Sequence, residues 1–332
     1  MSNKILKTVA RIQEKINEGQ FYEAQQQTRV VAARYTKAKD WNSAINILFN
    51  VAKSLLESNQ GGSGGDLGLM LIDVYLQAEL KPDSDNKAKL LKLLHLFDSD
   101  EPTRKKFVGD MIGWSIKYGQ YPAGDPDLHH IVGLIYAEEH DVYEAERHLT
   151  LGTKDSPDIL ANLEYEWYSH DDSHTAAHYA ARVVFPYLLA GNIRDANKSL
   201  QVFLSKLTTT NKSVPVQSIS SNTADVRIFP SIPLLNFLSL LILAIPKGNP
   251  DVFRQLFDRY LVQIKDIKIW DDTLTRIGEV YFGIVKPRPG NPLMDMLGGF
   301  FGGAAPSTPK AKRIGMEEAS KPSDLPVADD LD

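Results

Sequence analysis

The chain has 332 residues, of which 43% are hydrophobic and 24% charged, a composition typical of globular proteins that excludes a fibre or a wholly disordered chain. Its formal net charge of −5 argues against nucleic acid as the main partner, because phosphate neutralisation usually needs a basic domain. The chain has no cysteine, which excludes disulfides, thiolate metal sites and cysteine nucleophiles and favours a reducing compartment, here expected to be the cytosol.

No segment predicts a signal peptide or a membrane span. Residues 1–10 carry lysines at positions 4 and 7 among polar residues, so they lack the unbroken apolar core of a signal peptide. The longest apolar run, residues 234–245, lies between two prolines and is far shorter than the ~20 residues that a span requires. We therefore expect a buried helix there, no direct membrane insertion and a cytoplasmic protein.

Apolar residues recur at helical spacing through the first hundred residues. The pattern predicts helices over residues 5–16, 21–38, 41–56, 67–80 and 87–97. Between the third and the fourth, the glycine-rich stretch 59–65 predicts a loop, with Asp66 as the N-cap of the following helix.

The helical pattern continues to residue 284 with one interruption. Further helices are expected over residues 104–118, 127–139, 156–168, 175–190, 193–207, 234–245, 251–261 and 273–284. β-Branched residues alternate over 214–219 and 224–229, which predicts an inserted β-hairpin, with an irregular loop as the alternative. The apolar segment 291–301 is expected either to dock as a short helix or to cover the end of the stack, and residues 304–332 to be disordered.

Four helix starts share one pattern, a turn followed by a large apolar residue and, three residues later, an alanine. They lie at residues 19–24, 39–44, 140–145 and 191–196. The small alanine lets a neighbouring helix approach, and this combination is typical of tetratricopeptide-like helical hairpins. Such hairpins bury their apolar stripes only by stacking, so the predicted fold is all-α, a right-handed α-solenoid with irregular repeats.

Two stretches have the letters of catalytic or metal sites without their context. Residues 61–65 match G-x-S-x-G, but a helix rather than a strand precedes Ser63, so a turn between helices is expected. His170, His174 and His178 recur at helical spacing, but the glutamate of the H-E-x-x-H zinc signature is missing between the last two. We expect a solvated helix face there, with no metal, no cofactor and no catalytic residue.

Charge is unevenly distributed along the first hundred residues. Residues 1–56 contain nine Lys or Arg against four acids, and residues 57–101 contain nine acids against four lysines. Arg11 and Lys15, four residues apart, share one helical face, as do Gln25 and Arg29. Neighbouring surfaces of opposite sign suit a charged partner protein, with ordinary solvated helix surface as the alternative.

Several strings, in this order, resemble the Golgi-to-ER traffic protein four family over residues 5 to about 303. They are Phe21-Tyr22-Glu23-Ala24, the glycine-rich stretch with Asp66 and Leu67, Trp114-Ser115-Ile116-Lys117, residues 125–129, residues 142–148, and residues 281–285 followed by residues 293–301.

This resemblance implies a cytosolic, non-enzymatic scaffold in the post-translational delivery of tail-anchored membrane proteins to the endoplasmic reticulum. It implies that residues 1–150 bind and regulate the targeting ATPase, and that residues 151–303, with the hairpin near 210–232, bind a ubiquitin-like adaptor. The scaffold would thus bring a client from an upstream co-chaperone to the ATPase, and residues 304–332 would form a disordered tail.

The resemblance also assigns residues by position. For the ATPase these are Arg11, Lys15, Gln25, Arg29, Asp66 and Asp73, of which the two aspartates match acidic regulatory positions. Apolar candidates for the adaptor surface are Val226, Ile228, Phe229 and Phe237. The alternatives are a helical-repeat scaffold of another cytosolic complex, and a hydrolase or metalloprotein that uses Ser63 or the three histidines.

Overall fold

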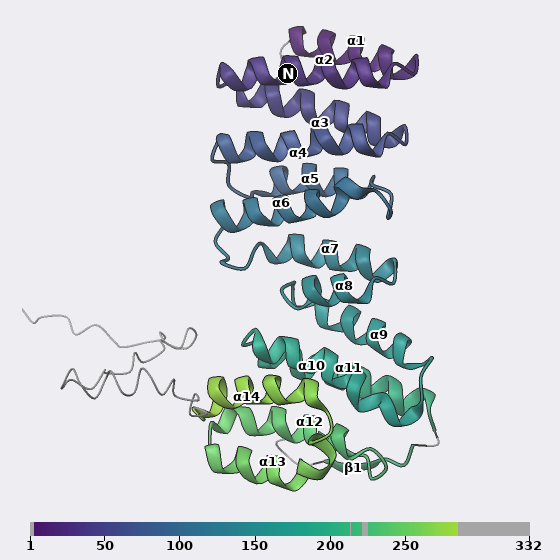
Figure 1. Cartoon of the computed structure of the whole chain (residues 1–332), viewed down its shortest axis with the longest axis vertical. Helices are drawn as coiled ribbons and strands as arrows, with labels where there is room; N and C mark the ends of the chain where they lie inside the picture. The colour runs from purple at the N-terminus through teal and green to yellow at the C-terminus, as the bar shows by residue number, and fades with distance from the viewer. Residues whose placement is uncertain (1–2, 213, 221–224, 285–332) are drawn as a thin grey trace, which may run out of the picture. The chain divides into compact units, whose positions relative to one another are not determined.

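The computed structural model describes residues 3–212, 214–220 and 225–284, all within one compact unit, Met1–Val285 (Figure 1). The first helices are α1 (Asn3–Asn17), α2 (Phe21–Lys37), α3 (Trp41–Glu57), α4 (Gly61–Gln77), α5 (Ser84–Leu94), α6 (Pro102–Tyr118), α7 (Pro126–Glu138) and α8 (Val142–Leu149). The later ones are α9 (Ser156–Tyr168), α10 (Ala176–Leu189), α11 (Ile193–Thr210), α12 (Pro233–Ala244), α13 (Pro250–Ile264) and α14 (Lys268–Phe282). Two 3₁₀ turns cover Ser173–Thr175 and Ile245–Lys247.

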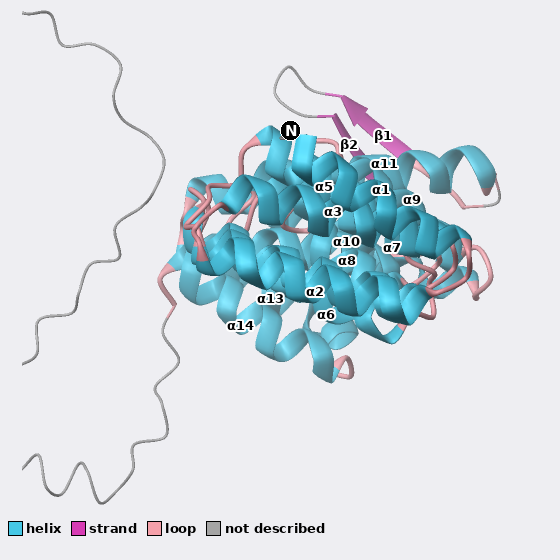
Figure 2. Ribbon diagram, turned by 90° about the horizontal axis from the view of Figure 1, so that it is seen from above, coloured by secondary structure: helices cyan, strands magenta, loops and turns pink. Residues whose placement is uncertain are grey.

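Helices α1 to α11 follow one another along the stack in chain order, whereas α14 turns back to lie beside α10, above α12 and α13 (Figure 1). Figure 2 views the same stack from above, with the helices lying over one another. The predicted all-α solenoid of helical hairpins is therefore confirmed. None of the helices in the described ranges is both long and apolar enough to cross a membrane.

Each of the four repeated helix starts has the predicted turn and the predicted buried alanine. In each of the four copies the turn contains one residue with positive φ: Gly19 (77°), Lys39 (57°), His140 (59°) and Gly191 (79°). In three copies the next side chain caps the new helix, as Asp40 does by accepting a hydrogen bond from the Ser43 amide at 3.3 Å. The alanine of every copy is fully buried: Ala24, Ala44, Ala145 and Ala196.

The predicted loop at residues 59–65 is wrong, because these glycines form the first turn of α4. Asn59 has φ 57° and Gln60 occupies the N-cap, so this stretch is another copy of the repeated helix start. Gly64 takes the place of the alanine, and a Cβ there would lie 2.6 Å from Cγ of Leu56 on α3. The glycines thus allow α4 to pack closer to its neighbours than alanine would, and Asp66 lies inside the helix.

The inserted hairpin is confirmed, with shorter strands than predicted. Strand β1 (Gln217–Ser220) pairs antiparallel with β2 (Asp225–Ile228), and Gln217 lies opposite Ile228. Figure 2 shows both strands at the edge of the helical stack. The segments predicted at 291–301 and 304–332 lie outside the described residues. The division predicted at residue 150 falls between α8 and α9, inside the compact unit, and stays a prediction.

Candidate functional site: two protein-binding surfaces

A polar cluster joins α2 and α4 and contains three of the residues predicted to bind the ATPase. Gln25 Nε2 donates to Asp66 Oδ2 at 2.8 Å, and Arg29 forms an ion pair with the same oxygen. Ser63 Oγ donates to Gln25 Oε1 at 3.1 Å. Both charged side chains remain accessible, with 46% of Arg29 and 37% of Asp66 exposed. The cluster therefore offers a cation and a carboxylate that are already paired with each other.

Arg11 and Lys15 lie one turn apart on α1, outside this cluster. Their helix buries Ile12 and Ile16 and leaves Arg11 exposed and Lys15 half-buried. Within the described residues neither cation forms an ion pair, in contrast to Arg29. These two positive charges are thus free to meet carboxylates of a partner.

Asp73 lies two turns after Asp66 on α4 and is exposed, accepting a hydrogen bond from Gln77 Nε2 at 2.7 Å. Both aspartates line a groove of about 760 Å³ between α4 and α6, whose other wall carries Lys106 and Lys117. The two lysines were not predicted as site residues. The sequence offered a hint, because Gly109 and Gly113 lie on α6 between the two lysines, and without side chains they leave the groove open.

The hairpin residues predicted for the adaptor lie at different depths. The backbone of Val226 pairs with Ile219, and the side chain of Ile228 is half-buried. Phe229 and Phe237 are both fully buried. The last two are therefore core residues of the free chain, and they are not at a surface that a partner contacts directly.

Asn236 and Arg227, which the sequence did not single out, hold the hairpin on the helices. Asn236 on α12 accepts from the Phe229 amide at 2.8 Å and donates to the Phe229 carbonyl at 2.9 Å. Arg227 donates to Ser205 Oγ of α11 at 3.1 Å. One and two turns after Asn236, Leu240 and Leu243 are exposed by 38% and 41%, so an apolar strip continues the hairpin base along α12. In the sequence, the i, i+4, i+7 spacing of Asn236, Leu240 and Leu243 indicates that they share one face of a helix.

Comparison with known proteins identifies the family of this chain. The family model for Golgi to ER traffic protein 4 matches residues 38–301. The chain belongs to the Golgi to ER traffic protein 4 family. The protein of that name in Aspergillus fumigatus is 51% identical over 317 residues, which cover 91% of this chain and 92% of the relative. The Schizosaccharomyces pombe protein of that name is 34% identical, covering 86% and 93%.

A solved structure of the same family supports the fold. The crystal structure of C. therm. Get4 superposes with a TM-score of 0.83 at 51% identity, covering 92% of this chain and 100% of that one. The likeness extends over the helices that carry both candidate surfaces. It places this member of the Golgi to ER traffic protein 4 family in the same architecture.

In this family member, the residues considered for catalysis and metal binding lie on or beside helices of the stack. Ser63 lies on α4 and donates to Gln25 Oε1. His170, His174 and His178 are exposed, and the described ranges contain no group of side chains that could hold a metal ion.

His129 and His148, by contrast, form a buried pair between α7 and α8 that the sequence reading missed. Their Nδ1 atoms are 2.9 Å apart, and Nε2 of His129 is 3.1 Å from the carbonyl oxygen of Ala123. Since a carbonyl only accepts, His129 carries its proton on Nε2, and its bare Nδ1 accepts from His148. The burial of His129 could have been predicted from the sequence, because His129 shares the apolar stripe of α7 with Val132 and Tyr136.

The histidine pair predicts a loss of stability in mild acid. Burial lowers the pKa of both imidazoles, that of His148 to about 4, and the neighbouring Arg147 acts in the same direction. In the unfolded chain His148 takes up a proton near pH 6.5, whereas in the folded chain it stays neutral until about pH 4. The free energy of unfolding should therefore fall as pH drops through this window, by roughly 3 kcal/mol for His148 alone.

Urea unfolding of the full chain at pH 7.5, 6 and 5 measures this fall. In His148→Asn the titrating group is gone, so the fall in the free energy of unfolding between pH 6 and 5 should be shallower. His140→Asn, which changes an exposed histidine at the turn before α8, serves as the control and should keep the parent slope. An unchanged slope in His148→Asn would contradict the prediction.

Proposed function

We propose that this protein is a non-enzymatic scaffold in the post-translational targeting of tail-anchored membrane proteins to the endoplasmic reticulum, and that it works in the cytosol. Its N-terminal half binds and regulates the targeting ATPase, and its C-terminal half binds a ubiquitin-like adaptor. Through that adaptor it receives clients from a co-chaperone. Membership of a family of traffic proteins supports this role, and so does a fold that carries two separate candidate surfaces.

The observation that carries the proposal is the polar cluster between α2 and α4. Gln25, Arg29 and Asp66 are expected on sequence resemblance to serve one interface, and the fold gathers them although Gln25 and Asp66 are 41 positions apart. In the proposed interface, Arg11 and Lys15 anchor the ATPase through free positive charge. Asp66 and Asp73 regulate it, and a cation of the ATPase competes with Arg29 for Asp66.

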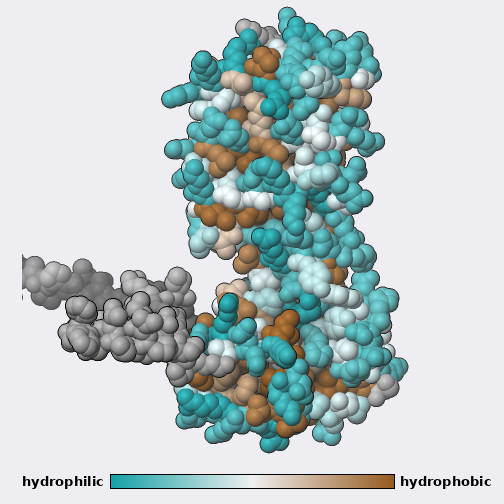
Figure 3. Space-filling model, in the orientation of Figure 1, coloured by the Kyte–Doolittle hydropathy of each residue, from teal (hydrophilic) through white to brown (hydrophobic). Residues whose placement is uncertain are grey.

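At the other end, the adaptor surface is proposed to consist of the hairpin and the exposed strip of α12. Val226 and Ile228 belong to it through their place in β2, and Leu240 and Leu243 extend it. Phe229 and Phe237 support this surface from the core, where they pack the end of the hairpin against α12. On the face seen in Figure 3, apolar side chains gather in bands between hydrophilic ones, including over the lower helices α12–α14. Apolar contact area of this kind suits a lasting partner.

Co-expression with a ubiquitin-like adaptor, followed by size-exclusion chromatography and nucleotide-dependent ATPase pull-down, tests the proposal. We expect a stable complex with the adaptor and binding of the ATPase by that complex. Leu240→Asp with Leu243→Asp should lose the adaptor and keep the ATPase, because a buried unpaired carboxylate is strongly unfavourable. Val262→Asp, at a 70% exposed position on α13, is the matched control. Recovery of neither partner would favour a scaffold of another assembly.

A further inference from the structure

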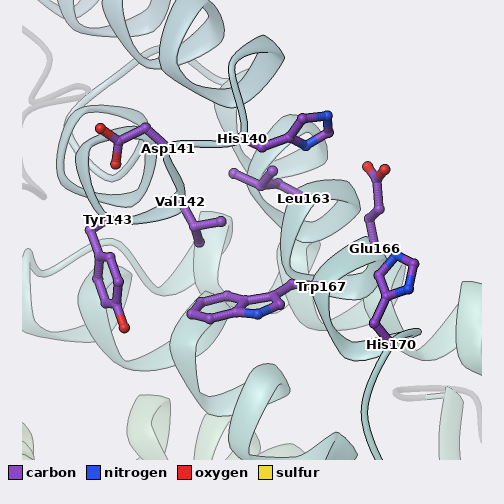
Figure 4. Close-up of a pocket in the computed structure, with 8 residues that line it drawn as sticks. All are labelled: His140, Asp141, Val142, Tyr143, Leu163, Glu166, Trp167 and His170. Carbon is purple, nitrogen blue, oxygen red and sulfur yellow. The ribbon is translucent and has the colours of Figure 1, made fainter.

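An open pocket of about 540 Å³ lies between the start of α8 and the C-terminal half of α9, among residues that the proposed function does not use. Figure 4 shows Asp141 and Tyr143 on one side of it, Glu166 and His170 on the other, and the indole of Trp167 between them. The volume lies in the range of ~300–1,000 Å³ that is usual for ligand sites. It exceeds what one small ion would fill.

The aromatic walls of the pocket are fixed before anything binds. The guanidinium of Arg182 lies 5.0 Å from the ring centroids of both Tyr143 and Trp167. That guanidinium is itself held by Glu164, with contacts of 3.0 and 3.1 Å from Nε to the two carboxylate oxygens. The edge-on ring of Tyr179 supports Trp167 at 5.5 Å. A ligand therefore meets ordered rings, and little conformational entropy is lost on binding.

Two carboxylates, those of Asp141 and Glu166, line the pocket, and no lysine or arginine does. The other acids nearby are largely neutralised, since Glu139, Glu144, Glu146, Asp158 and Glu164 pair with Arg104, Lys105, Arg182 and Lys198. Glu166 is exposed, and its carboxylate makes no hydrogen bond or ion pair with another described residue. Aromatic rings beside the unpaired Glu166 carboxylate attract a cation through both the ring quadrupole and the carboxylate charge.

We propose that this pocket binds an arginine or lysine side chain in a short basic segment of a partner protein. The cationic group lies over Trp167 and pairs with Glu166, while the adjoining residues of the segment occupy the rest of the pocket. Further exposed carboxylates, those of Glu138 and Asp172, extend the negative surface beyond the pocket. That extension fits a peptide with several positive charges better than a single free cation.

The test is a fluorescence-anisotropy titration of the full chain with a fluorescein-labelled peptide, Gly-Arg-Leu-Arg-Gly. We expect saturable binding that Glu166→Gln weakens about threefold and Glu166→Lys about tenfold or more, because reversal adds repulsion to the lost ion pair. Asp155→Lys makes the same charge change at the other end of α9, away from the pocket, and should stay within about twofold of the parent. Circular dichroism checks that each variant is folded.

A second peptide separates the charge of the ligand from its shape. Citrulline in place of arginine keeps the size and removes the charge, so this peptide should not bind. Equal binding of the two peptides, no loss in Glu166→Lys, an equal loss in Asp155→Lys or no binding by the parent protein would each overturn the proposal. Displacement by spermine as effective as by unlabelled peptide would reassign the pocket to free polyamines.

Discussion

Replacing Arg11 and Lys15 together by glutamate is expected to abolish binding of the targeting ATPase while the fold and adaptor binding stay unchanged. Arg11 is exposed, Lys15 is half-buried, and neither pairs with a described carboxylate, so their reversal breaks no internal ion pair. At the interface each reversal turns an attraction into a repulsion, which costs about 2 kcal/mol or more. The two reversals together should therefore lower the affinity by roughly 1,000-fold.

Isothermal titration calorimetry with the nucleotide-bound ATPase measures this loss, and the association rate of the parent protein should fall steeply with added salt. Lys89→Glu with Lys92→Glu on α5 changes the net charge equally without touching the predicted face. Retained affinity in the α1 variant would disprove the site assignment. An equal loss in the α5 variant would show a non-specific effect of net charge.

Most of the helical fold followed from periodicity, because a buried stripe at helical spacing is a direct consequence of packing on one side. The repeated helix starts were also predictable, since a positive-φ turn, a capping side chain and a buried alanine each favour particular residues. The exception was the fourth helix. Glycine is a poor helix former in isolation, and only the contact between Gly64 and Leu56 shows why it is used there.

The candidate surfaces were predictable to different degrees. The position of Gln25 and Arg29 on one face follows from their spacing, but their meeting with Asp66 depends on how α2 packs beside α4. In the hairpin, an apolar residue type could not distinguish a contact surface from the core. Phe229 is buried because Asn236 holds its backbone against α12, a tertiary contact with no local signature.

Replacing a glycine at the start of α4 is expected to have a large effect on the stability of the fold. Gly64→Leu should destabilise the fold by about 3 kcal/mol, because even its Cβ would lie 2.6 Å from Leu56 Cγ and 3.1 Å from the Ala52 carbonyl oxygen. The backbone contact cannot move aside as a side chain can. The helix must shift away from α3, which also pulls Asp66 from Arg29 and Gln25.

Gly62→Leu, in the same helical turn, is the matched control, because nothing lies within 4 Å of a Cβ at that position. There the gain in helix propensity acts alone, and the variant should be stabilised by ~0.5 kcal/mol. Urea unfolding followed by circular dichroism measures both. If both variants were stabilised, the close approach of α3 and α4 would not be what selects glycine, and propensity alone would decide the helix start. Opposite signs would show that packing selects glycine at position 64.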